Sequence, residues 1–239
     1  MSIVIFGANG GIGSALARSL VAGGTEVHLV GRDAERLQSL GAELSSSVTV
    51  GDALDADMFA RAIADAGAPL QGLVYAIGSL TLKPLGRTTD DDLLHDFRVN
   101  AMGAAQAIRA ALPALKAAEH ASVVLFSSVA AGHGFASHAS IAMAKGAVEA
   151  LTRSMAAELA PKVRVNCIAP SLTRTPLSAP LLATEQMSAL LAQLHPLQRL
   201  GEIDDLVSAA EFLLSEKAGW MTGQVIAVDG GRSTLAGRK

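Results

Sequence analysis

The chain has 239 residues, of which 50% are hydrophobic and 17% are charged, and its net charge is −3. This length suits one compact domain, and so high an apolar fraction excludes a disordered chain. The 19 basic residues form no block and are outnumbered by 22 acidic ones, so we expect no nucleic-acid partner.

The single cysteine, Cys167, excludes an internal disulfide and a Cys-rich metal site and favours a reducing, cytoplasmic location. The apolar run at residues 3–6 has no basic region before it, and Gly7 interrupts it, so we expect no signal peptide. No stretch of about 18 apolar residues predicts a membrane span. The six histidines show no metal-ligand spacing, so we expect no metal.

Strands and helices alternate along the chain. Apolar and β-branched runs predict strands at residues 2–6, 26–30, 47–50, 70–76, 122–127, 163–167 and 224–228. Helical periodicity predicts helices at 12–21, 34–44, 57–66, 91–118 (bent at Pro113), 138–160 and 203–214. Strands joined through helices form parallel sheets with right-handed crossovers. The sequence therefore predicts one α/β domain, residues 1–239, with a doubly wound, seven-stranded parallel sheet and helices on both faces.

A glycine-rich turn, Gly-Ala-Asn-Gly-Gly-Ile-Gly, occupies residues 7–13 between the first strand and the first helix. Glycines at such a junction let the backbone approach a pyrophosphate, which binds at the helix N-terminus. The turn therefore predicts dinucleotide binding. Its spacing is one residue longer than that of the commonest fingerprint.

This spacing resembles that of the short-chain dehydrogenase/reductase family, and the similarity continues along nearly the whole chain. Segments that resemble the family's motifs are Leu73–Gly78 (with both asparagines of the family motif lost), Val99-Asn100, Phe126-Ser127-Ser128, Arg164–Asn166, Pro170–Thr175 (with Ser171 for glycine), Thr222–Gln224 and Val228–Gly231. The resemblance implies a Rossmann-type fold and a pyridine nucleotide.

The second strand ends at Gly31, where NAD-dependent relatives usually carry an acid, and Arg32 follows. Because a guanidinium suits the 2′-phosphate, we predict NADP(H). Alternatively, Arg32 is a solvated loop residue beside Asp33. Asp52 resembles an adenine-amine acceptor, or it merely begins a turn. The resemblance implies these nucleotide-binding residues: Gly7, Asn9, Gly11, Ile12, Gly13, Arg32, Asp52, Ala76, Gly78, Lys145, Pro170, Thr173 and Thr175.

The resemblance implies a catalytic set of Asn100, Ser128 and Lys145, but the family's tyrosine is missing. Counting back four residues from Lys145 gives Ile141, and the only tyrosine is Tyr75, for which we expect a structural role. An alkyl group neither stabilises nor protonates an alkoxide. Three possibilities stay open. The proton donor is His138 or, less favoured, His133, or the substrate is an iminium, whose nitrogen is already cationic, so that a missing phenol matters less.

We therefore predict an NADP(H)-dependent oxidoreductase acting on a small apolar carbonyl or imine. The alternative is a nucleotide-binding protein with a sensing or structural role. A lid-like insertion is expected at about 176–200, where leucines suggest an apolar substrate or simply a packing helix. Alanine-rich faces on the two long helices predict a homodimer or homotetramer.

Overall fold

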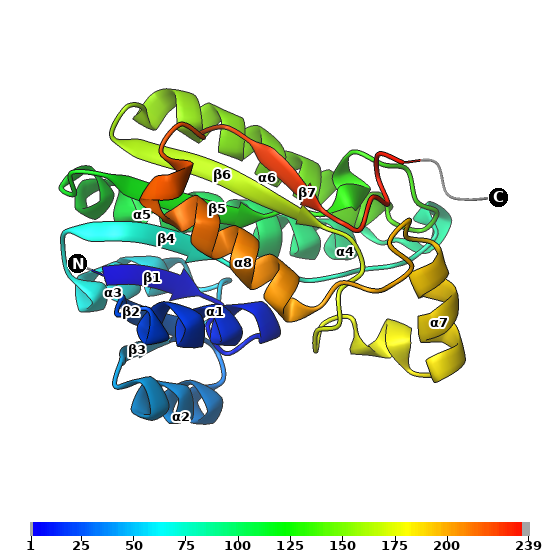
Figure 1. The fold of residues 1–239 in the computed structure, drawn as a ribbon, viewed down its shortest axis with the longest axis horizontal. Coiled ribbons are helices and arrows are strands. Elements are labelled where there is room, and N and C mark those ends of the chain that lie inside the picture. Colours follow the sequence, from blue (N-terminus) through cyan, green and yellow to red (C-terminus); the bar gives the residue numbers. More distant parts are fainter. Residues whose placement is uncertain (1, 236–239) are drawn as a thin grey trace.

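The computed structural model describes residues 2–235, and its strands form one parallel sheet. The strands are β1 Ser2–Phe6, β2 Glu26–Gly31, β3 Ser47–Val50, β4 Leu70–Tyr75, β5 Ala121–Phe126, β6 Val163–Pro170 and β7 Val225–Val228. Their order is β3-β2-β1-β4-β5-β6-β7 (Figure 1), and every neighbouring pair is parallel. The predicted doubly wound, seven-stranded sheet is confirmed.

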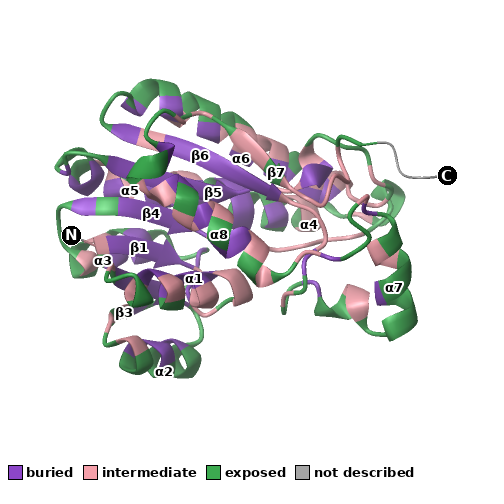
Figure 2. Cartoon of the chain, in the orientation of Figure 1, coloured by how far each residue is buried: buried purple, intermediate pink, exposed green. Residues whose placement is uncertain are grey.

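Helices cover both faces of this sheet. They are α1 Gly11–Ala22, α2 Ala34–Leu44, α3 Ala56–Ala66, α4 Asp90–Phe97, α5 Gly103–Lys116, α6 Ala139–Leu159, α7 Glu185–Gln193 and α8 Ile203–Leu214. Side chains alternate along a strand, so Val4 and Phe6 join the core with α3, α5 and α6, whereas Ile3 and Ile5 join the core with α1, α2 and α8. Figure 2 shows the resulting buried central strands, and all six residues of β5 are buried.

The helix predicted at 91–118 is interrupted, and the prediction of one continuous helix is wrong. A π-helical segment, Arg98–Met102, separates α4 from α5, while α5 continues through Pro113. The side-chain Nδ2 of Asn100 donates to the Asp96 carbonyl at 2.8 Å. That carbonyl is the one that the Asn100 amide would use in an α-helix, so the side chain competes with the regular ladder.

The sheet places its functional edge at the carboxyl ends of the strands. The chain order reverses between β1 and β4, which opens a crevice at that edge. The insertion at 176–200 forms a short 3₁₀ turn, Ala179–Leu182, followed by α7, and Figure 1 shows α7 set apart from the sheet beyond this edge. Within residues 2–235, no helix combines the length and apolarity needed to cross a bilayer.

Candidate functional site

A continuous cleft of about 1190 Å³ lies along the carboxyl edge of the sheet. It runs from the turn after β1, past the ends of β2, β4, β5 and β6, to the segment that contains α7. Most of the residues singled out from the sequence line it: Gly7, Asn9, Gly11, Ile12, Arg32, Asp52, Ala76, Gly78, Ser128, His138, Lys145, Pro170, Thr173 and Thr175. Gly13 and Asn100 are not among the lining residues. Gly13 packs against the Gly7 carbonyl, and Asn100 hydrogen-bonds to Ser79, which does line the cleft.

The glycine turn forms a close-packed cradle at the start of α1. Gly7 has φ +86°, and a Cβ there would lie 2.9 Å from the Ala76 carbonyl carbon. A Cβ at Gly13 would lie 2.2 Å from the Gly7 carbonyl oxygen, so this glycine permits contact between helix and turn. No side chain caps α1, whose N-cap is Gly10, and its first amides are therefore available to an anion. This cradle fits the pyrophosphate of a dinucleotide.

Two guanidinium groups lie at the end of β2. Arg32 and Arg36 both line the cleft beside Gly31. Asp33, the acid that follows Arg32, also lines the cleft, where it caps α2 by accepting from the Arg36 amide at 3.1 Å and pairs with Arg36 Nε at 3.4 Å. The Arg32 guanidinium has no acidic partner among residues 2–235. This part of the wall therefore fits a 2′-phosphate. Arg36, four residues after Arg32 and in the first turn of α2, was missed by sequence reasoning.

Asp52 lines the cleft after β3, and its Oδ1 accepts from the Leu54 amide at 2.8 Å. The carboxylate therefore does stabilise a turn, which was one of its two interpretations. Asp52 also lines the cleft, and the second interpretation, that its carboxylate accepts from the adenine amine, stays a prediction.

Ser128, Ile141 and Lys145 meet at the other end of the cleft. Ser128 Oγ accepts from the Ala130 amide at 3.2 Å and retains a proton to donate. Lys145 Nζ donates to the Phe126 carbonyl at 2.8 Å, and burial lowers the pKa of Lys145 to about 8. Ile141 lies on the wall, 2% exposed, and its side chain offers no polar atom.

A buried polar network stands behind this end of the cleft. The Asp96 carboxylate, 0% exposed, accepts from Ser79 Oγ and from Ser140 Oγ, each at 2.6 Å. Asn100 Nδ2 donates to Ser79 Oγ at 2.9 Å, whereas Asn100 Oδ1 is buried without a protein partner. The pattern of the sequence gave no reason to single out Asp96.

The unpartnered Asn100 Oδ1 and the Lys145 ammonium face the same spot. A Cβ added at Gly78 would lie 3.3 Å from Asn100 Oδ1 and 3.6 Å from Lys145 Nζ. An unpaired buried acceptor is costly, and a cofactor hydroxyl or a bound water here would satisfy it. This arrangement fits a nicotinamide ribose at Lys145.

His133 and His138 both pack against the ring of Phe135. Phe135 lies between them, with ring centroids 4.9 Å from His133 and 5.4 Å from His138, and Arg232 lies 5.4 Å from its centre. His138 lines the cleft, and its Nδ1 pairs with the Ala136 carbonyl at 2.7 Å; His133 is not among the lining residues. The role of His138 as a proton donor stays a prediction.

A different histidine is joined to a hydroxyl in the cleft wall. Ser171 Oγ lies 2.8 Å from His195 Nε2, and His195 Nδ1 lies 2.9 Å from the Leu191 carbonyl oxygen. Both side chains line the cleft, and His195 is 4% exposed. The two residues are 24 apart, and no sequence pattern links them.

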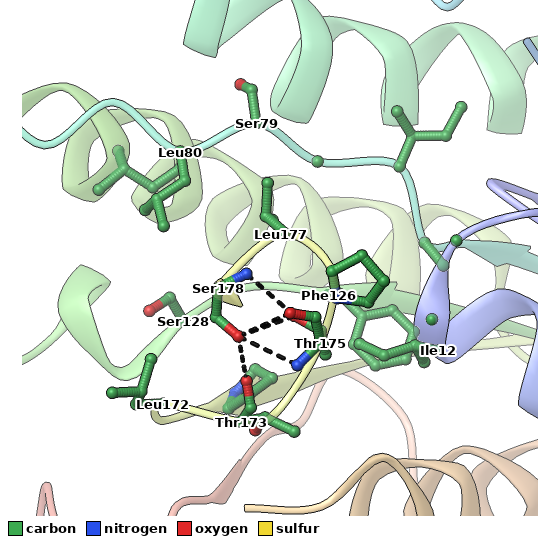
Figure 3. A pocket seen from close by; sticks show the side chains of 18 of the residues that line it. Ile12, Ser79, Leu80, Phe126, Ser128, Leu172, Thr173, Thr175, Leu177 and Ser178 are labelled. Carbon is green, nitrogen blue, oxygen red and sulfur yellow. Dashed lines mark hydrogen bonds between the residues drawn. The ribbon is translucent and has the colours of Figure 1, made fainter. Parts of the chain in front are cut away.

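The loop that follows β6 is held in shape by Ser178. Figure 3 shows this side chain directed at Thr175 and Thr173: Ser178 Oγ accepts from the Thr175 amide at 3.0 Å and donates to the Thr173 carbonyl. Leu172 and Ser128 lie on the same side of the pocket (Figure 3). The lid segment starts against the glycine turn, because a Cβ at Gly11 would lie 2.8 Å from Pro176 Cδ.

Tyr75 is part of the core, as the sequence led us to expect. It is 2% exposed, its hydroxyl donates to the Val99 carbonyl at 2.6 Å, and burial raises its pKa. Among residues 2–235, no group of three or more His, Cys, Asp or Glu side chains is arranged to hold a metal ion.

Comparison with known proteins agrees with this geometry. A family model described as "Enoyl-(Acyl carrier protein) reductase" matches residues 7–233. The chain is 35% identical to the "Inactive 2-(S)-hydroxypropyl-CoM dehydrogenase 2" of Xanthobacter autotrophicus, over 92% of this chain and 100% of that one.

Solved structures are similar over almost the whole chain. A short-chain type dehydrogenase/reductase from Mycobacterium ulcerans superposes with a TM-score of 0.91 at 32% identity, covering 99% of this chain and 90% of that one. A gluconate 5-dehydrogenase from Burkholderia cenocepacia, in complex with NADP and tartrate, superposes with a TM-score of 0.92 at 29% identity, covering 98% and 96%. With its NAD(P)-binding Rossmann fold and these matches, the chain belongs to the short-chain dehydrogenase/reductase family of oxidoreductases.

Proposed function

We propose that this protein is an NADP(H)-dependent oxidoreductase that reduces a small apolar carbonyl or imine by hydride transfer. The observation that carries the proposal is the continuity of one cleft. It joins the uncapped start of α1 and the guanidinium groups of Arg32 and Arg36 to Lys145 and Ser128. A dinucleotide phosphate has its pyrophosphate, its 2′-phosphate and its nicotinamide spaced along such a path.

Different residues of the chain bind the cofactor and orient the substrate in this reaction. Bound NADPH supplies the hydride. The α1 amides hold the pyrophosphate, and Arg32 and Arg36 hold the 2′-phosphate with charge-assisted hydrogen bonds. Lys145 holds the nicotinamide ribose and adds positive potential. Ser128 donates a hydrogen bond to the substrate oxygen or nitrogen and so orients it.

The substrate end of the cleft is apolar. Its lining includes Leu172, Leu177, Leu181, Leu191 and Leu194, four of them from the insertion. Such a wall favours burial of an alkyl or aryl group. Ile141 favours an iminium over a ketone as substrate. Hydride transfer to an iminium, whose nitrogen is already cationic, gives a neutral amine, whereas hydride transfer to a ketone gives an alkoxide that needs a proton donor.

The alternative function is an NADP(H)-binding protein that senses the nucleotide or serves as a structural subunit. Ile141 supports it, because losing a positioned general acid typically lowers a rate by about 10²- to 10⁴-fold. A relative bearing the word "Inactive" in its name also supports it, since that relative matches 92% of this chain.

One experiment separates the two functions. NADPH absorbance is followed with a panel of small apolar ketones and cyclic imines, while NADPH binding is measured by fluorescence titration. The oxidoreductase predicts consumption of NADPH, faster with imines than with ketones at one pH. Binding without consumption across the panel would establish the alternative, and absence of binding would overturn both.

Cofactor preference is tested at the end of β2. Arg32→Ala removes a charge-assisted contact worth about 1.5–3 kcal/mol, so the Kd for NADPH is expected to rise by roughly 10- to 100-fold. The Kd for NADH, which lacks the 2′-phosphate, should change little. A parallel loss of affinity for both nucleotides would contradict the proposed phosphate site.

A further inference from the structure

The wall of the same cleft contains a serine and a histidine whose geometry suits proton transfer, and neither belongs to the residues that resemble the family's catalytic set. Ser171 follows the carboxyl end of β6, and its hydroxyl lies 2.8 Å from His195 Nε2. His195 follows α7, and its position is fixed by the backbone: its amide donates to Ala192, and its carbonyl accepts from Gln198.

The hydrogen bonds define which ring nitrogen of His195 carries the proton. His195 Nδ1 lies 2.9 Å from the Leu191 carbonyl oxygen, which only accepts, so Nδ1 is protonated. In neutral His195, Nε2 is therefore the acceptor and Ser171 Oγ the donor. In the imidazolium, Nε2–H instead donates to Ser171 Oγ, which frees the serine proton for another acceptor.

This pair separates two cavities. Ser171 and His195 line the main cleft, which also contains Ser128 and Ile141, and they also line a smaller cavity of about 350 Å³. Charged groups of the smaller cavity are Asp229, Asp205 and Arg199, and those of the main cleft include Lys145 and Arg232.

Charged groups of the smaller cavity lie around the pair. Asp205 and Arg199 are paired with each other at 2.6 Å. Partial burial of Asp229 opposes its charge, but hydrogen bonds from Ser233 and the Gly231 amide and the attraction of His195 lower the pKa of Asp229 below its usual value. A carboxylate therefore remains beside His195 at neutral pH.

We propose that Ser171 and His195 form the proton-donating pair that serves in place of the missing phenol when the substrate is a ketone; this rests on the proposed NADP(H)-dependent reduction. The carbonyl carbon gains the hydride and its electron pair from NADPH, and the C=O π electrons move to oxygen. The alkoxide takes the proton of Ser171 Oγ, which takes the Nε2 proton of the His195 imidazolium. Neutral His195 regains a proton from solvent through the smaller cavity.

The substrate panel distinguishes this role from a structural one. Ser171→Ala and His195→Gln remove the proton donor, so single-turnover reduction of ketones is expected to fall by about 10²-fold. Reduction of a preformed iminium, which takes no proton at the reacting atom, and the Kd for NADPH should stay within about twofold. Ser188→Ala, which removes a buried hydroxyl from α7 outside both cavities, serves as the matched control.

A spectroscopic readout tests the pair without turnover. Long-range ¹H–¹⁵N spectra, with His195 assigned through His195→Gln, should show the Nδ1–H tautomer in the unmodified protein at high pH. Ser171→Ala should shift the Nε2 resonance, and Ser188→Ala should not. An Nε2–H tautomer, or equal losses for ketone and iminium, would overturn the pair while leaving the oxidoreductase intact. A wild-type protein that consumes no NADPH would overturn both proposals.

Discussion

Residue 141 is an isoleucine at the position where the resemblance to the family implies a tyrosine. The isoleucine occupies the cleft wall four residues before Lys145, with its side chain 2% exposed. The surrounding groups, Ser128 and Lys145, are in place on the same wall. A hydroxyl-bearing ring at this position would therefore find the partners it needs.

We expect Ile141→Tyr to raise the rate of ketone reduction by about 10²-fold or more, because a phenol beside the Lys145 ammonium is a competent proton donor. The rate of NADPH oxidation measures the effect. Ile141→Phe adds the same ring without the hydroxyl and is the control. An equal gain in both variants would show that ring volume, rather than proton donation, is responsible.

Lys145 gives the site a pH dependence of defined sign. Burial lowers its pKa to about 8, so the ammonium is present below that pH and is lost as pH rises through it. Because a charged donor holds a hydroxyl more strongly than a neutral one, the Kd for NADPH should increase by up to about tenfold across this range. Fluorescence titrations on either side of pH 8 measure this change.

Lys145→Arg provides the test of that assignment, because a guanidinium stays charged throughout. Its Kd for NADPH is expected to be flat with pH, whatever its absolute value. A variant that keeps the wild-type pH dependence would place the titrating group elsewhere.

At the level of single elements, α4 contributes an unusual buried carboxyl group, that of Asp96. Burial of the Asp96 side chain is tolerated because the hydroxyls of Ser79 and Ser140 each donate a hydrogen bond to its carboxylate. Through Ser79 the carboxylate also orients the Asn100 amide. The π-helical segment that follows α4 is part of the same arrangement, since Asn100 takes the Asp96 carbonyl.

Asp96→Ala is expected to lower the free energy of unfolding by about 2–5 kcal/mol, because it removes the acceptor of both the Ser79 and the Ser140 hydroxyl in a buried site. Urea denaturation monitored by circular dichroism measures this loss. Asp91→Ala, on the exposed side of the same helix, should change the stability by less than about 1 kcal/mol. Similar losses in the two variants would contradict a structural role for the buried network.

At the scale of the whole molecule, the prediction of a homodimer or homotetramer depends on the exposed surfaces of the long helices. Exposed apolar side chains on α4, the π-helical segment and α6 include Phe97, Met102 and Met143, the last 63% exposed. Exposed apolar side chains of this kind on neighbouring elements favour contact with a second copy.

Met143→Glu is therefore expected to weaken self-association by at least about tenfold, since it places a charge in an apolar contact. Sedimentation equilibrium over a range of concentrations measures the dissociation constant. Ala42→Glu introduces the same charge on exposed α2, which packs on the other face of the sheet. A monomeric wild-type protein, or equal weakening by both variants, would exclude this interface.

The sequence by itself determined the fold, because apolar runs of strand length alternating with helical periodicity permit few topologies, and a glycine turn after the first strand marks the edge that binds the nucleotide. It also showed that Ile141 cannot supply a proton, since that conclusion depends only on residue type and on spacing from Lys145.

Only the tertiary structure brought Ser171 next to His195, placed Arg36 beside Arg32 in the cleft, and buried Asp96 between two serines. These contacts form between residues of different elements, or they depend on which side of a helix faces the core. Local periodicity describes each element separately, and it contains no information about the distance between side chains that meet only when the sheet and its helices pack together.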